Sequence, residues 1–440
     1  MKVILNNVIM RLNINKLNNR LGILFTSCIY IVAFLIVHPS IIAQDVESTD
    51  FKEYKGVVVD AKTQKSLEYA SISVTNSNIS TITNLDGAFL VKVPNALNGE
   101  KVLISYLGYQ NRIVSLNSFG SDQLKIEMDE SFEKLPDVNL VEADPISVIR
   151  KVIENRKLNS YKESTIVKAF YRESIKKRRT YASLSEAVVD IYKQPRGVQS
   201  DYVVLERARK STDYRKIDTL VIKLQGGPYN NLSMDMIRNE ELFFSAEMFD
   251  IYKFTFDKMM NLDDRNVFVI DFAQRPTMVE PFYKGKLYID SETYALVKAV
   301  FGLNLQNLTK AKKFFVKKKP YNADVIPLDT NYIVDYKDTD GKWHFNYSRI
   351  ELSFKIKWDK KLFNSIYNVA IEMAITDWKN NIDEVSIKNK ERMRRSVILT
   401  DQTSGFTDPE FWGELNVIEP DKSIDNAIKK IQRNYQKEQS

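Results

Sequence analysis

The segment YKGKLYIDSETYALVKAVFGLN, residues 283–304, decides the fold class of the larger part of this chain. Leu287 and Ile289 alternate with polar or amphipathic neighbours, as in a strand that buries one face. Turn-forming residues follow at 290–293, and a second apolar run returns at 296–301. The segment therefore predicts an antiparallel β-hairpin.

Segments of the same kind lie on both sides of this hairpin. Strand-like alternation is found in TIVKAFYRES (165–174), RTYASLSEAVVDIYK (179–193), NVFVIDFAQR (266–275), TNYIVDYKDTDGKWHFNYSRIELSFKIKW (330–358) and SIYNVAIEMAITDWK (365–379). The longest segment folds back at Asp338–Gly341, where a hairpin turn is the simpler explanation than a cation held by Asp338 and Asp340. We expect one large, strongly curved antiparallel sheet with a few helices, whose concave aromatic residues either fill the core or line an apolar groove.

Helices are expected at the two ends of this domain. In the first helix, Asp144 is the candidate N-cap with Pro145 in the first turn. Ile146, Ile149 and Ile153 recur at helical spacing with Val152 alongside, which predicts one apolar face. The last helix has Ser423 as its expected cap, and its apolar face must dock on the sheet or on a partner. That face comprises Ile424, Ile428, Ile431 and Tyr435.

The region before this domain consists of short strands separated by turn signals. Alternation predicts that Ala70, Ile72, Val74, Phe89, Val91 and Val93 point inward. The stretch KVLISYLGY, residues 101–109, is apolar on both faces, which predicts a central strand covered on both sides. Asp86-Gly87 predicts a tight turn in which Asp86 caps its own turn, because no further acids follow to complete a calcium loop. The pattern predicts a small antiparallel β-sandwich.

Three stretches of this region resemble the carboxypeptidase regulatory-like domain, a transthyretin-like β-sandwich. They are GVVVDAKTQKSLEYASISV (56–74), TNLDGAFLVKVP (83–94) and LISYLGY (103–109), within a resemblance that covers about residues 54–128. The resemblance implies a non-catalytic appendage common on bacterial envelope proteins, without a zinc peptidase. More weakly, the hairpin at 283–301 resembles half-barrel lipoprotein-carrier and sorting proteins, and residues 144–431 resemble uncharacterised domains that follow such modules.

The first residues predict an export signal. Four basic residues precede the apolar stretch Leu21–Val37, and Ala43-Gln44 follows, so we expect a secretory signal peptide cut near Ala43. An uncleaved membrane anchor is the alternative, because the apolar stretch reaches the short limit of a membrane span. Cys28 lies inside the apolar stretch and is not a lipidation site.

The composition of the mature chain excludes several classes of chemistry. Cleavage removes Cys28, His38 and four basic residues, which lowers the formal net charge from +7 to +3 and leaves His344 as the sole histidine. A zinc site needs several His or Cys ligands, and a serine or cysteine hydrolase usually needs a histidine base. We therefore predict no catalytic, cofactor-binding or metal-binding residue, no nucleic-acid partner, and a structural role for His344 beside Trp and Phe.

Other charged and aromatic residues have simple structural interpretations. The adjacent acids Glu240-Glu241 and Asp263-Asp264 diverge on a strand or helix and do not form an acid/base pair. The segment KAKKFFVKKKP, residues 310–320, is either a solvated loop or a contact with anionic lipid headgroups. Trp412 is expected to anchor a short helix capped by Asp408.

The predicted organisation is a signal peptide at 1–43, a sandwich at 44–130, a linker at 131–145 and a curved-sheet domain at 146–440. The leading hypothesis is a non-enzymatic exported protein, periplasmic or outer-membrane associated, whose sandwich docks and whose large sheet binds an apolar ligand, a lipid-linked molecule or an envelope protein. A carboxylate-dependent envelope hydrolase helped by His344 is one alternative. A purely structural or adhesive β protein, without a pocket, is another.

Overall fold

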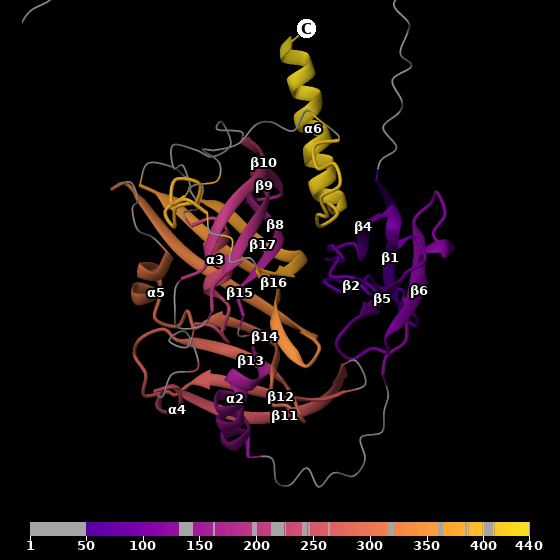
Figure 1. Ribbon diagram of the computed structural model, residues 1–440. Helices are drawn as coiled ribbons and strands as arrows, with labels where there is room; N and C mark the ends of the chain where they lie inside the picture. Colours follow the sequence, from indigo (N-terminus) through magenta and orange to yellow (C-terminus); the bar gives the residue numbers. More distant parts are fainter. Residues whose placement is uncertain are drawn as a thin grey trace, which may run out of the picture. The chain divides into compact units, whose positions relative to one another are not determined.

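A computed structural model gives the fold (Figure 1). It describes residues 50–440 except 132–143, 162, 196–199, 213–223, 225, 240–243, 245–246, 263–264, 316–320, 360–363, 383–384, 386, 398, 400–407, 409 and 440, and it leaves out the side chains of 211, 212, 431, 432 and 434–439. The expected signal peptide and most of the expected linker lie outside the described residues. Residues 50–440 form a single structural unit.

The first domain is a β-sandwich of two small sheets, as predicted. Their strand orders are β4-β1-β7 and β3-β2-β5-β6, and every pair is antiparallel except β1 with β7. The elements are β1 (Phe51–Asp60), β2 (Ser71–Val74), β3 (Ser80–Ile82), β4 (Ala88–Pro94), η1 (Asn95–Leu97), β5 (Lys101–Ser105), β6 (Arg112–Ser115), η2 (Leu116–Ser118) and β7 (Leu124–Met128). All six residues predicted to point inward are buried.

Strand β5 is covered differently from its prediction. It lies inside its sheet, between β2 and β6, and Val102 and Ile104 are fully buried. Leu103, on the opposite face, is only partly buried. Leu107, beyond the strand, packs against the core of the large domain. The apolar residues of this segment therefore pack into two different cores, one at the strand and one beyond it. Contrary to the prediction, they do not cover both faces of a single central strand.

The turn at Asp86-Gly87 is present, but its cap is Asn84. The side-chain oxygen of Asn84 accepts hydrogen bonds from the backbone N–H groups of Asp86 and Ala88, each at 2.9 Å. The Asp86 carboxylate instead accepts the backbone N–H of Lys422 at 2.7 Å. Gly87 has a φ of +73°, and a Cβ there would lie 2.5 Å from the Val58 carbonyl oxygen. The motif thus closes a turn and also holds the distant C-terminal helix.

The second domain is an open antiparallel sheet of ten strands, in the order β10-β9-β8-β17-β16-β15-β14-β13-β12-β11 (Figure 1). The strands are β8 (Thr165–Lys177), β9 (Thr180–Lys193), β10 (Tyr202–Thr212), β11 (Tyr252–Leu262), β12 (Arg265–Gln274), β13 (Tyr283–Asp290), β14 (Leu296–Leu303), β15 (Ala323–Thr339), β16 (Lys342–Trp358) and β17 (Ser365–Asn380). The predicted antiparallel sheet is confirmed. The two edge strands, β10 and β11, have no counterpart among the predicted strands.

Both predicted hairpin turns form. Between β13 and β14, Asp290 Oδ1 accepts the backbone N–H of Thr293 at 2.7 Å. Between β15 and β16, Asp340 and Gly341 have φ values of +52° and +75°. Asp338 forms an ion pair with Arg265. The turn interpretation of this segment is therefore confirmed.

One face of the large sheet carries the main hydrophobic core. The cross-strand neighbours Phe301, Tyr332 and Ile350 are all buried in it. Residues of three helices pack into the same cluster: α2 (Pro145–Asn159), α3 (Pro228–Ser233) and α4 (Met248–Ile251). Of the two alternatives for the aromatic face, the described residues favour the filled core.

Helix α2 begins as predicted and buries most of its predicted apolar face. Asp144 is its N-cap and accepts the backbone N–H of Ser147 at 3.0 Å. Ile149 is fully buried, whereas Ile146 is 37% exposed. Val152 of the predicted face is buried and Ile153 packs against the core. Val148 and Arg156 are buried in addition, which sequence periodicity did not predict.

The last helix, α6 (Lys422–Gln439), is capped by Asp421 and not by Ser423. Asp421 Oδ1 accepts the backbone N–H of Ile424 at 2.8 Å, and the Ser423 hydroxyl instead bonds the Tyr181 hydroxyl at 2.9 Å. Ile424 and Ile428 pack against Leu184, as the docking expectation required. The side chains of Ile431 and Tyr435 lie outside the described residues.

The lysine-rich segment begins as a helix, α5 (Leu308–Phe315), instead of the predicted loop. Lys310 pairs with Glu280, and Lys312 Nζ lies 2.9 Å from Asp324 Oδ2. Residues 316–320 lie outside the described range. The expected lipid contact of this segment stays a prediction.

The C-terminal segment before α6 lies between the sandwich and the sheet. Trp412 sits in a turn and not in the predicted helix, although Asp408 does accept the backbone N–H of Glu410. Its indole packs edge-on against Phe170 of β8, with 5.8 Å between ring centroids. Ile82 of the sandwich belongs to the same apolar cluster. The sandwich is thus docked on its own chain, on the sheet face opposite the main core.

Candidate functional site

A fork in the large sheet creates the candidate site. The hydrogen-bonded ladder between β16 and β17 stops at the pair Tyr347 and Ala374. Beyond it, β16 stays paired with β15 and β17 stays paired with β8. Each strand carries a register shift at this point, with Asn346 and Thr376 as the extra residues. Such bulges bend a strand and end its pairing, so the two strands diverge.

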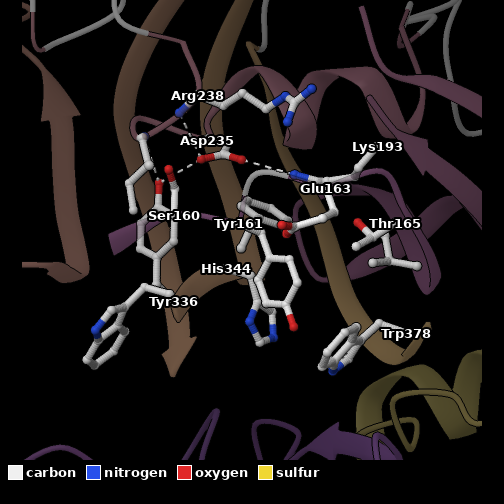
Figure 2. A pocket seen from close by; sticks show the side chains of 14 residues that line it. Ser160, Tyr161, Glu163, Thr165, Lys193, Asp235, Arg238, Tyr336, His344 and Trp378 are labelled. Atoms are coloured by element: carbon white, nitrogen blue, oxygen red, sulfur yellow. Dashed lines mark hydrogen bonds and ion pairs between the residues drawn. The ribbon is translucent and has the colours of Figure 1, made fainter. Parts of the chain in front are cut away.

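A cleft with a cavity volume of about 70 Å³ lies at this fork, and we call it the fork cleft (Figure 2). Its aromatic walls include Tyr161, Trp343, His344 and Trp378. The Tyr161 and His344 rings lie 5.4 and 5.7 Å from Trp378, centroid to centroid. A β-bridge from Ser160 to Trp343 holds the end of α2 in position, and so places Tyr161.

The Trp343 indole is 4% exposed and lines the cleft. Its N–H finds no hydrogen-bond acceptor among the described residues. A buried donor without an acceptor destabilises a protein by about 1–3 kcal/mol, so such groups call for an explanation. The nitrogen itself has almost no accessible surface, so an acceptor on a ligand in the cleft would reach this N–H only after a small shift of the indole.

The polar wall of the cleft is a network of paired charges. Lys193 Nζ lies 3.1 Å from Asp235 Oδ2, and the Tyr336 hydroxyl donates to Asp235 Oδ1 at 3.2 Å. Arg238 pairs with Asp201 at 2.6 Å. Figure 2 shows Lys193 and Tyr336 converging on Asp235. The network leaves little net charge and fixes the polar groups in place.

His344 lies in this cleft as a neutral side chain. Burial lowers its pKa to about 4, and the positive charges of Lys337 and Lys193 act in the same direction. It lies beside Trp378, as the sequence suggested for a structural histidine. What the sequence did not reveal is that Tyr161 and Trp378 converge on it, because they are far apart in the chain. Among the described residues, no carboxylate or nucleophile is hydrogen-bonded to the His344 imidazole. The geometry therefore does not support the hypothesis that His344 helps in hydrolysis.

The sandwich covers the open edge of β17 at the fork. Asn78 Nδ2 donates to the Trp378 carbonyl oxygen at 2.8 Å, and the Ser80 hydroxyl donates to the Ile375 carbonyl oxygen at 3.1 Å. Both carbonyl groups lie on β17 beyond its last pair with β16. Side chains of the hairpin β2–β3 thus satisfy an edge that the divergence of the strands exposes.

The buried carboxylate of Glu372 is engaged by two arginines. Glu372 accepts from Arg172 at 3.1 Å and from Arg349 at 2.9 Å, and Arg349 also binds Glu351 at 2.8 Å. Glu351 and Glu372 do share a cavity, which the hydrolase hypothesis required. However, both oxygens of Glu372 already accept guanidinium hydrogen bonds, which opposes a role in proton transfer.

The described residues contain no group of three or more His, Cys, Asp or Glu side chains placed to hold a metal ion. Among the helices of the described part, none is long and apolar enough to cross a membrane. The acidic pairs at 240–241 and 263–264 lie outside that part.

Comparison with known proteins identifies the sandwich. Residues 54–140 match the family model of the CarboxypepD_reg-like domain. The resemblance inferred from the sequence is therefore confirmed for this part of the chain. No curated protein matches the chain.

The chain is also similar to solved structures at low identity. They include a putative outer membrane lipoprotein-sorting protein domain from Vibrio parahaemolyticus (12% identity, 56% of this chain and 96% of that chain, TM-score 0.25) and a DUF1329 family protein from Desulfovibrio piger (9%, 56% and 96%, 0.25). A LolA superfamily protein from Nitrosomonas europaea is a third (10%, 57% and 100%, 0.19). Similarity at this level does not indicate what this chain binds.

Proposed function

We propose that this chain is an exported, non-catalytic binding protein of the cell envelope and that the fork cleft holds its ligand. The ligand has an apolar, ring-like face for the Tyr161–Trp378 wall and an oxygen that accepts the Trp343 N–H. The polar head of a lipid-linked molecule has these properties. The observation that supports the proposal most directly is the buried Trp343 N–H without an acceptor, at the wall of an aromatic cleft.

The geometry of the cleft favours binding over chemistry. Its basic side chains are tied to acids, as Lys193 is to Asp235 and Arg238 is to Asp201, and the one further acid of the described lining, Glu163, is exposed. Aromatic walls with a few fixed polar groups are the usual composition of a small-molecule site. A structural or adhesive protein would not need such a cleft.

The export and localisation part of the proposal depends on the first 43 residues. Expression in a Gram-negative host, followed by fractionation and N-terminal sequencing, tests it. A mature N-terminus at Gln44 in the periplasmic or membrane fraction supports export with cleavage. A full-length chain in the cytoplasm would refute it.

Tryptophan fluorescence tests the ligand site, since Trp343 and Trp378 both line it. The probe is an organic extract of the host envelope, dispersed in mild detergent and titrated into the purified chain. We expect saturable quenching in the wild type and at least about tenfold weaker binding in Trp378→Ala, through the loss of one aromatic wall.

Trp358→Phe is the matched control, because this tryptophan lies at the other end of β16 and does not line the cleft. Binding should be unchanged in this variant. Mass spectrometry of the extract bound to the wild type then identifies the ligand. Equal binding by Trp378→Ala and the wild type, or no bound molecule at all, would reject the fork cleft as the site.

A further inference from the structure

A second cavity lies where the sandwich, helix α6 and the opposite face of the sheet meet, and we call it the junction cavity. Its volume is about 310 Å³. Strands β8, β16 and β17 form its floor, while Leu85 of the sandwich turn and Asp421 and Ile424 of the α6 start also line it. A single water needs only about 10–15 Å³ of such space, so the cavity has room for a small molecule.

The floor is a rigid ion-pair network whose members are already satisfied. Arg172 donates to Glu186 at 2.7 Å, to Glu372 at 3.1 Å and to the Ile418 carbonyl oxygen at 2.8 Å. Arg349 binds Glu372 and Glu351. Because carboxylates already pair with these guanidinium groups, the groups shape the cavity and attract a strongly charged ligand less than a free cation would.

Other groups in the lining are unengaged. The Ser174 hydroxyl, on a residue 6% exposed, makes no hydrogen bond with the described part of the chain. Asn368 Oδ1 accepts from the Ser353 hydroxyl at 2.6 Å, which directs the Asn368 Nδ2 donor elsewhere. The Asp329 carboxylate, on an exposed residue of β15, has no ion-pair partner within the described residues. The cavity therefore offers a hydroxyl, an amide donor and a carboxylate acceptor.

Charges of both signs line the cavity, since the carboxylates of Asp329, Glu351, Glu372 and Asp421 face the cations Arg172, Lys176 and Arg349. A charged ligand of either sign would be attracted by one set and repelled by the other, so the lining favours neither sign. The walls are too polar for a purely apolar ligand, which would leave their donors and acceptors without partners.

We propose that the junction cavity is a second binding site, distinct from the fork cleft, for a small, neutral, hydroxyl-rich molecule of the monosaccharide class. Hydroxyl groups both donate and accept, which matches the mixed set of Ser174, Asn368 and Asp329. The ligand touches the sheet, the sandwich turn and α6 together, so its binding stabilises their docking.

Calorimetric titration tests this proposal on the full mature chain. The probes are glucose, galactose and N-acetylglucosamine, with glucuronate and glucosamine as the anionic and cationic comparisons. We expect at least one neutral sugar to bind with a Kd below about 1 mM, and the charged sugars to bind at least about tenfold more weakly. The same neutral sugar should raise the melting temperature.

Three variants locate the binding. Ser174→Ala and Asn368→Leu should each lower the affinity for the neutral sugar by about tenfold, because a ligand hydroxyl loses its hydrogen-bond partner. Trp378→Ala, in the fork cleft, should leave this affinity unchanged. Circular dichroism melting of each variant in the absence of sugar shows whether it is folded.

The possible outcomes separate this site from the fork cleft. Binding lost in Trp378→Ala but kept in Ser174→Ala and Asn368→Leu would place the sugar in the fork cleft and overturn the junction site. If no neutral sugar binds at about 10 mM, the cavity holds only water, and the proposed junction site is overturned as well. Neither result affects the lipid-extract test of the fork cleft.

Discussion

The substitution Glu173→Gln should make this protein more stable above pH 7. Glu173 lies on β8 on the core face of the large sheet and is 3% exposed. The Tyr171 hydroxyl donates to it at 2.8 Å, but no cation pairs with it among the described residues. Burial raises the pKa of Glu173 from 4.5 to about 7. At higher pH, the folded protein must hold an unpaired carboxylate in its core.

The size of the effect follows from the two pKa values. The pKa of this carboxyl is about 7 in the folded protein and 4.5 in the unfolded chain. Deprotonation of Glu173 in the folded protein therefore lowers the free energy of unfolding by about 3 kcal/mol. The sign follows from proton binding, because between these values the folded state holds the proton that the unfolded state has released. The stability is therefore complete below pH 4.5 and is lost as the pH rises through about 7.

Urea unfolding at pH 5 and pH 8 measures this difference. Gln keeps the size of the side chain and an acceptor for the Tyr171 hydroxyl but carries no charge. We expect Glu173→Gln to match the wild type at low pH and to exceed it by up to about 3 kcal/mol at pH 8. A variant whose stability advantage does not grow between the two pH values would refute the reasoning.

Glu186→Gln is the matched control, as Glu186 is an equally buried carboxylate on the neighbouring strand. Burial alone would raise the pKa of Glu186, but the guanidinium groups of Arg172 and Arg209 outweigh it and lower the pKa. The ionised Glu186 therefore contributes to the stability of the fold above pH 4.5, and this contribution is lost as the pH falls. Glu186→Gln should destabilise the protein at pH 8 by about 3–5 kcal/mol, the opposite of Glu173→Gln.

Three further substitutions or titrations test other parts of the structure. Asp421→Ala removes the cap of α6 and should lower the free energy of unfolding by about 1 kcal/mol in urea titration, and an unchanged midpoint would argue against this cap. Gly87→Ala should be destabilised by about 1–3 kcal/mol in thermal melting, because the residue has a positive φ and its Cβ would meet the Val58 carbonyl oxygen; a neutral result would mean that the turn differs. The imidazole of His344 should remain neutral until the pH falls to about 4, as followed by NMR of histidine-labelled mature chain, and a midpoint near 6.5 would contradict its burial.

Local alternation carried most of the fold prediction. Residues such as Ile72 and Phe89 face inward as predicted, because strand side chains alternate between two faces whatever surrounds them. The edge strands β10 and β11 were missed. In β11, the burial pattern mixes partly covered and exposed positions, which weakens the sequence signal of an edge strand.

Capping and helix orientation depended on contacts that sequence spacing does not contain. Asp86 follows Asn84 in a motif that predicts a self-capped turn, yet its carboxylate binds Lys422, more than 300 residues away. Ile146 has helical spacing with the buried Ile149 but stays 37% exposed, while Val148 is buried. A local pattern leaves such choices open, and the packing partner decides them.

The sequence by itself determined that this is a β-rich chain with a regulatory-like sandwich, and that residues 44–440 contain no thiol and one imidazole. These properties depend on residue types and on a two-residue period, and both are local. Only the tertiary structure decided where a ligand fits. The fork cleft exists because bulges at Asn346 and Thr376 separate two strands, and the junction cavity exists because a C-terminal helix docks between a sandwich and a sheet. Both join side chains from distant segments, and their convergence follows from how the strands pair and not from their order in the chain.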